Sequence, residues 1–149
     1  MQFQSVGESR HGGMDFALSQ EEELMQQTTI AQAVSRTGTG LHSGKPVSLT
    51  LEPAPADSGI MFARNNGNSS HGGHAPKAGN VRASGLCTTL FLGDRAVATV
   101  EHLLAAIRGM GVDNVRIRAE GGEIPILDGS SAPFGGLLHS AGIRRLNAP

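Results

Sequence analysis

Residues 86–107 read LCTTLFLGDRAVATVEHLLAAI, and this run predicts a β-hairpin that leads directly into a helix. Residues 86–92 have the composition of a strand, rich in β-branched and aromatic side chains. Residues 93–94, Gly-Asp, are typical of a two-residue hairpin turn, so residues 95–98 are expected to return as the partner strand. The chain is therefore predicted to pass from strand to helix with almost no linker.

The predicted helix begins after Thr99, which can cap it, and ends at Gly109 or Gly111. Glu101 places a negative charge in the first turn, where the helix dipole favours it. Four apolar residues follow the i, i+3, i+4, i+7 spacing of one buried stripe: Val100, Leu103, Leu104 and Ile107. This stripe predicts that the helix packs against a sheet.

Further strands and a second helix are predicted on both sides of this unit. Residues 47–52 and 115–119 alternate apolar and polar side chains with the two-residue period of a half-buried strand. Residues 60–63 and 123–127 are expected to form short extended pieces, and residues 130–142 a helix that glycine stops. The order of elements predicts an α+β fold, with two helices packed on one face of a mostly antiparallel or mixed sheet.

Two glycine-rich stretches are expected to be loops. Residues 37–44, TGTGLHSG, contain His42, and such a loop either approaches a ligand closely or forms an ordinary tight turn. Residues 65–79 offer almost nothing to bury and are expected to be exposed. His71 and His74 lie in this second stretch, but two imidazoles in a glycine loop lack the other ligands that a specific metal site needs.

Length and charge limit the classes of protein that the chain can represent. Its 149 residues suit one compact domain, which we expect at 27–149, preceded by a flexible extension at 1–26. A net charge of −1 gives no basic field, so nucleic-acid binding is not expected. No apolar run approaches the roughly 20 residues of a transmembrane helix, and the N-terminus lacks the apolar core of a secretory signal, which favours a cytoplasmic protein.

Glu101 and His102 form the most informative pair in the sequence. A helix N-terminus disfavours an imidazolium, which leaves His102 able to offer a lone pair to a metal ion. Glu101 projects about 100° around the helix, where it could accept a proton from metal-bound water. The alternative is that Glu101 only stabilises the first turn of the helix through its negative charge, and that His102 is a structural histidine.

The other reactive residues are open to two interpretations. Cys87, the single cysteine, fits a small buried side chain better than a nucleophile. Asp128 most simply orders the turn before the last helix through side-chain to backbone hydrogen bonds. A catalytic zinc ion takes three protein ligands, and HExxH is absent from the sequence, so a complete zinc site does not follow from these residues.

Several segments, taken in order, resemble the first domain of one family, the zinc-dependent UDP-3-O-acyl-N-acetylglucosamine deacetylases of lipid A synthesis. The resemblance covers about residues 27–147. The matching segments are GTGLHSGK at 38–45, LCTTL at 86–90, TVEHLLAA at 99–106, GVDN at 111–114 and EIPILDGSSAPF at 123–134.

The resemblance implies a role for particular residues. Glu101 would be the general base and His102 one ligand of a Zn²⁺ ion whose ligand set is incomplete in this chain. His42, Leu86, Cys87 and Asp128 would lie near the site or the substrate.

The same resemblance implies what acts with the chain. The substrate is a UDP-3-O-acyl-amino sugar that loses its N-acetyl group. The remaining zinc ligands, a histidine and an aspartate, belong to a second domain that packs its helices against those of the first. No counterpart of that domain is found in the 149 residues, so a partner chain or self-association is expected to cover the helices, and the lone chain is expected to be inactive.

Two other interpretations stay open. The chain could be a noncatalytic module with a nucleotide-sugar-binding or regulatory role. It could also be a truncated remnant. One departure from the family concerns stability, because Gly135 and Gly136 stand where bulkier residues are expected and weaken the last helix.

Overall fold

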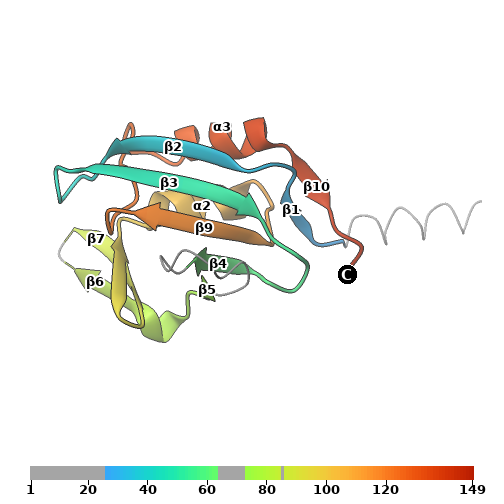
Figure 1. Ribbon diagram of the computed structural model, residues 1–149, viewed down its shortest axis with the longest axis horizontal. Coiled ribbons are helices and arrows are strands. Elements are labelled where there is room, and N and C mark those ends of the chain that lie inside the picture. The colour runs from blue at the N-terminus through green and yellow to red at the C-terminus, as the bar shows by residue number, and fades with distance from the viewer. Residues whose placement is uncertain (1–25, 64–72, 85) are drawn as a thin grey trace, which may run out of the picture.

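The computed structural model describes residues 26–63, 73–84 and 86–149 (Figure 1). The predicted extension at 1–26 lies almost entirely outside the described residues, and so does His71. The fold class is as predicted from the sequence: a mixed sheet and two helices in an α+β arrangement.

The main sheet has five strands in the order β2-β3-β9-β4-β5. Their bounds are β2 Val34–Thr39, β3 Pro46–Pro53, β9 Val115–Glu120, β4 Ile60–Ala63 and β5 Gly73–His74. All neighbouring pairs are antiparallel except β4 with β9, which is parallel. Leu51 lies opposite Ile117 across β3 and β9, and both side chains are fully buried, as the two-residue period predicted.

Two smaller sheets complete the β structure. β6 Val81–Ser84, β7 Cys87–Leu92 and β8 Arg95–Ala98 form an antiparallel meander, in which β7 and β8 are the predicted hairpin. β1 Thr28–Ile30 pairs with β10 Ile143–Arg145, which ties the two ends of the domain together. A short 3-10 helix, η1 Ala78–Asn80, precedes β6.

The helices α2 Glu101–Gly109 and α3 Ala132–Ala141 lie on one face of the main sheet and contact each other (Figure 1). Their inward side chains meet those of the sheet in a mainly aliphatic core. Its largest fully buried members include Leu49, Leu51, Leu103, Ile107, Ile117, Phe134 and Leu138. Burial of this apolar surface is the main favourable contribution to folding. None of the helices in the described residues is long and apolar enough to cross a bilayer.

The structure corrects several sequence predictions. Residues 123–127 do not form a strand, since only an isolated bridge joins Glu123 to Ala98. Residues 37–39 belong to β2, and the loop begins at Gly40. Part of the expected loop at 65–79 is ordered as β5 and η1. Residues 37–39 are ordered by pairing with β3, and β5 is ordered by pairing with β4, so strand pairing overrides their glycine-rich composition.

Thr99 does not cap α2. The N-cap position is Val100, with no side-chain hydrogen bond, and the Thr99 hydroxyl bonds elsewhere. At the other helix, Pro133 in the first turn and Gly142 at the end stand as predicted, with Gly142 at φ 70°. A side chain at residue 142 would be strained in that conformation, so glycine is needed to end α3.

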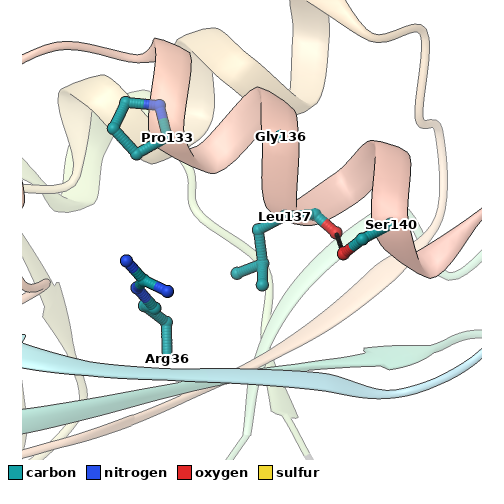
Figure 2. Close-up of a pocket in the computed structure, with 5 residues that line it drawn as sticks. All are labelled: Arg36, Pro133, Gly136, Leu137 and Ser140. Atoms are coloured by element: carbon teal, nitrogen blue, oxygen red, sulfur yellow. Dashed lines mark hydrogen bonds between the residues drawn. The ribbon is translucent and has the colours of Figure 1, made fainter.

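Gly136 borders a hollow between α3 and β2. Figure 2 shows Leu137 pointing from α3 toward β2 and Arg36 pointing from β2 toward α3. The hollow has a volume of about 250 Å³, and a Cβ at residue 136 would meet no atom within 4 Å. Glycine therefore leaves this part of the helix underpacked.

We expect Gly136→Ala to raise the free energy of unfolding by about 1 kcal/mol, because alanine stabilises a helix interior by this amount relative to glycine. Urea denaturation at pH 7 measures the change. Gly142→Ala is the matched control and should lower stability, because residue 142 has φ 70°. A lower unfolding midpoint for Gly136→Ala would contradict the open space beside α3.

Candidate functional site

The start of α2 is joined to β7 by two hydrogen bonds of Thr88. Its N–H donates to Glu101 Oε2 at 3.1 Å, and its carbonyl accepts from Val100 N–H at 3.4 Å. Glu101 is half-buried, and no further hydrogen bond of its carboxylate occurs within the described residues. One oxygen thus fixes the side chain while the other stays available.

His102 follows on the same first turn and is also half-buried. Within the part of the chain that the structure describes, its imidazole makes no hydrogen bond or ion pair. The described ranges also hold no cluster of three or more histidine, cysteine, aspartate or glutamate side chains arranged to bind a metal ion. His102 can therefore act as one ligand, but these residues do not complete a site.

The turn from β8 into α2 has a strained backbone. Thr99 has φ 59°, a conformation that β-branched residues rarely adopt. Strain of this kind persists only where surrounding contacts hold it. Here Ala98 exchanges backbone hydrogen bonds with Gly122 and Ile124 on either side of Glu123, and the Thr99 hydroxyl donates to Glu123 Oε1 at 3.0 Å.

Glu123 is the centre of this arrangement. Its side chain is 3% exposed and accepts three hydrogen bonds: from Thr99, from His42 N–H at 3.0 Å and from Ser43 N–H at 3.1 Å. A Cβ at residue 40 would lie 2.3 Å from Glu123 Oε2, so only glycine lets the carboxylate approach the loop this closely. Consecutive backbone N–H groups form the kind of concavity that binds an anion.

Burial opposes the charge on Glu123, but the hydrogen bonds from His42, Ser43 and Thr99 outweigh it and hold the pKa of this carboxyl below its ordinary value. The carboxylate is therefore ionised at neutral pH. A buried anion with three donors fixes the geometry of every segment that contributes one.

Of the other predicted site residues, Leu86 and Cys87 lie near Glu101, whereas His42 and Asp128 make no direct hydrogen bond to it within the described residues. Leu86 and Cys87 directly precede Thr88 and so lie near Glu101 at the start of α2, with Leu86 89% exposed and Cys87 half-buried. His42 is exposed, and its backbone N–H is linked to Thr99, just before α2, through the carboxylate of Glu123.

Asp128 is exposed and orders its own turn by accepting hydrogen bonds from the N–H and hydroxyl of Ser130. No hydrogen bond joins it to Glu101 or His102 among the described residues.

Sequence reasoning missed Glu123 and the contacts of Thr99. One signal was present: Glu123 heads the apolar run Glu-Ile-Pro-Ile-Leu, and a carboxylate beside such a run needs donors if it is buried. The identity of those donors was not readable, because His42 is 81 residues away along the chain.

An α+β domain that presents a glutamate and a histidine at a tightly held strand-to-helix turn is a class of structure suited to metal-assisted hydrolysis. Comparison with known proteins narrows this class. Residues 27–149 match the family model described as LpxC: UDP-3-O-acyl N-acetylglycosamine deacetylase. The chain belongs to this family.

Curated relatives agree with the family. The chain is 55% identical over 125 residues to a UDP-3-O-acyl-N-acetylglucosamine deacetylase of Oleidesulfovibrio alaskensis, an alignment that covers 84% of this chain and 41% of the relative. It is 51% identical over 121 residues to that of Nitratidesulfovibrio vulgaris, covering 81% and 39%. The chain thus spans about two fifths of the length of the relatives that it matches.

The pH dependence of stability tests the buried carboxylate. Because the pKa of Glu123 is lowered by folding, its contribution is complete above the unfolded-state pKa of about 4.3 and is lost as pH falls through the lower folded-state pKa. We expect Glu123→Gln to reduce the free energy of unfolding at pH 7 by about 1–3 kcal/mol, and the difference from wild type to shrink below about pH 4.

Urea denaturation at a series of pH values provides the measurement. Glu120→Gln is the control, because Glu120 is exposed and its carboxylate accepts a hydrogen bond from the hydroxyl of Ser48. A difference between wild type and Glu123→Gln that stays constant down to pH 3 would argue against an ionised Glu123.

Proposed function

We propose that this chain supplies part of the active site of a zinc-dependent deacetylase that removes the N-acetyl group of UDP-3-O-acyl-N-acetylglucosamine. The observation that carries the proposal is the first turn of α2, where Glu101 is fixed by Thr88 and His102 has no hydrogen-bond partner among the described residues. Membership of the deacetylase family supports the choice of reaction and substrate.

Glu101 acts as the general base. One carboxylate oxygen accepts the N–H of Thr88, which restricts the side chain to one orientation. The second oxygen is free to accept a proton from the water that attacks the acetamide carbonyl, and the same group can then deliver the proton to the departing amine. A fixed base contributes more than a mobile one because its orientation needs no reorganisation in the transition state.

His102 would be one ligand of a Zn²⁺ ion, and such an ion would supply a water of lowered pKa and a Lewis acid for the carbonyl. The described residues contain no three-ligand cluster, and we propose that a second domain or a partner chain would supply the remaining ligands. The relatives are long enough to contain such a domain, since this chain aligns with only 41% of the Oleidesulfovibrio protein.

The second domain covers the helices α2 and α3 and closes the site between the two helical layers. Leu86 and Cys87 then line the approach to Glu101, His42 lies on the loop above Glu123, and Asp128 borders the passage for the substrate. The active assembly works in the cytoplasm, and the chain alone is inactive because its described residues hold no complete set of zinc ligands.

A second candidate function is a noncatalytic module that binds a nucleotide sugar or regulates. The absence of a three-ligand cluster in the described residues favours it, whereas the retained Glu101 and His102 favour the enzyme.

Complementation with the missing part of a relative distinguishes the enzyme from the noncatalytic module. The chain is coexpressed with the remaining part of the Oleidesulfovibrio relative, and zinc content and acetate release from the UDP-sugar are measured. An assembly that is free of zinc and inert would exclude the enzyme.

In the complemented assembly, Glu101→Gln should lower kcat by a factor on the order of 10² to 10⁴, because glutamine cannot accept the proton from water. Zinc content and the far-ultraviolet circular dichroism spectrum should be unchanged. The control Glu120→Gln changes an exposed glutamate at the end of β9 and should retain full activity. Full activity of Glu101→Gln would remove this residue from the mechanism.

His102→Ala should lower the zinc affinity of the assembly by at least about tenfold, because even residues that only support a ligand change metal affinity by that factor. Competition with a fluorescent zinc chelator measures it. The matched control is His139→Ala, an exposed histidine at the end of α3. Equal zinc affinity of the two variants would exclude His102 as a ligand.

A further inference from the structure

Two segments of the candidate site are joined by one buried side chain that the proposed mechanism does not use. Glu123 accepts hydrogen bonds from the backbone N–H groups of His42 and Ser43 on one side and from the hydroxyl of Thr99 on the other. We propose that Glu123 is a positioning residue, which fixes the loop at 40–44 to the β8–α2 turn and so sets the orientation of Glu101 and His102.

The loop at 40–44 is closed by its own backbone but leaves two donors for Glu123. Gly40 and Gly44 close it by a backbone hydrogen bond of 3.0 Å, and Gly40 N–H donates to the carbonyl of Lys45 at 3.0 Å. The N–H groups of His42 and Ser43 point to Glu123, so the carboxylate satisfies two donors that the loop itself leaves unpaired. The backbone at His42 is therefore fixed by a hydrogen bond to the Glu123 carboxylate.

The β8–α2 turn is held to the same carboxylate through Thr99. Thr99 has φ 59° and is 2% exposed, and its hydroxyl donates to the same oxygen of Glu123 that accepts from His42. Glu101 follows after one residue. If Thr99 relaxed to a negative φ, the direction of the first turn of α2 would change, and the hydrogen bond from Thr88 to Glu101 would be lost.

The hydrogen-bonding pattern around residue 123 selects a glutamate side chain. Three donors face the two oxygens of Glu123, and all three are satisfied only by a carboxylate of this length. Glutamine would place an NH₂ group against one of the donors, and aspartate would withdraw the oxygens by one methylene. The arrangement thus requires a glutamate at this position. Among the described residues Glu123 makes no hydrogen bond to Glu101 or His102, so it acts through Thr99 and the loop.

Amide hydrogen exchange followed by NMR tests the inference on the whole chain. In Glu123→Gln, exchange at His42, Ser43 and Thr88 should accelerate on the order of tenfold or more relative to core amides such as Leu51. Glu120→Gln should match wild type. Ile117→Ala is the control for general destabilisation, because Ile117 is fully buried in β9, and it should leave the ratio of these amides to the core unchanged.

Thr99→Val is a second variant that keeps the shape of the side chain and removes only the hydroxyl. It should accelerate exchange at Thr88 and shift the amide resonances of the first turn of α2, while His42 and Ser43 stay protected. Unchanged Thr88 exchange in both Thr99→Val and Glu123→Gln would overturn the inference, and so would uniform acceleration of all amides in Glu123→Gln.

The consequence for catalysis rests on the proposed function and is measured in the complemented assembly. There Glu123→Gln should lower kcat by about ten- to a hundredfold, which is the loss expected when a catalytic group is misplaced. Zinc binding and the pH optimum should be retained. Undiminished kcat in an active assembly would overturn the inference. If the wild-type assembly is inert, the proposed function fails, while the exchange measurements on the chain alone still decide whether Glu123 positions the first turn of α2.

Discussion

The buried carboxylate of Glu123 is the constraint on which the geometry of the site depends. A charged group taken out of water must be matched by donors, and this one is matched by two backbone N–H groups and one hydroxyl. The donors come from parts of the chain that are distant in sequence. Satisfying one anion therefore brings the loop at 40–44 and the turn at Thr99 into one fixed arrangement.

The fold makes this arrangement possible by supplying a rigid frame. β9 lies between β3 and β4 in the main sheet, and α2 and α3 cover one face of that sheet (Figure 1). The chain leaves β9 and reaches Glu123 after two glycines at positive φ, Gly121 and Gly122. Such a tight turn places Glu123 beside the end of β8 rather than in a new strand.

Residues on regular elements and residues in connecting segments have different roles in the site. Residues on regular elements carry the chemistry that we assign: Glu101 and His102 stand on α2, and Thr88 on β7 holds Glu101. Residues in connecting segments fix the elements relative to each other, as Glu123 and Thr99 do. The described residues hold no three-ligand cluster. The chain spans about two fifths of the length of its relatives.

The sequence by itself determined the elements whose signals are local. The hairpin of β7 and β8, the helix that follows it, the alternating strands β3 and β9, and the stop of α3 at Gly142 were all predicted from spacing and composition. So was the placement of Glu101 and His102 in one helical turn. Short pieces such as β1, β5 and β10 were missed, because they are strands only through the partners that they find.

Only the tertiary structure decided which of these elements meet. Three kinds of contact join residues separated by 13 to 81 positions: the parallel pairing of β4 with β9, the hydrogen bond from Thr88 to Glu101 and the three hydrogen bonds of Glu123. Periodicity within a segment tells which face of an element is buried, but it carries no information on the partner that buries it. The energy that selects the partner arises only when the whole core and its buried polar groups are satisfied together.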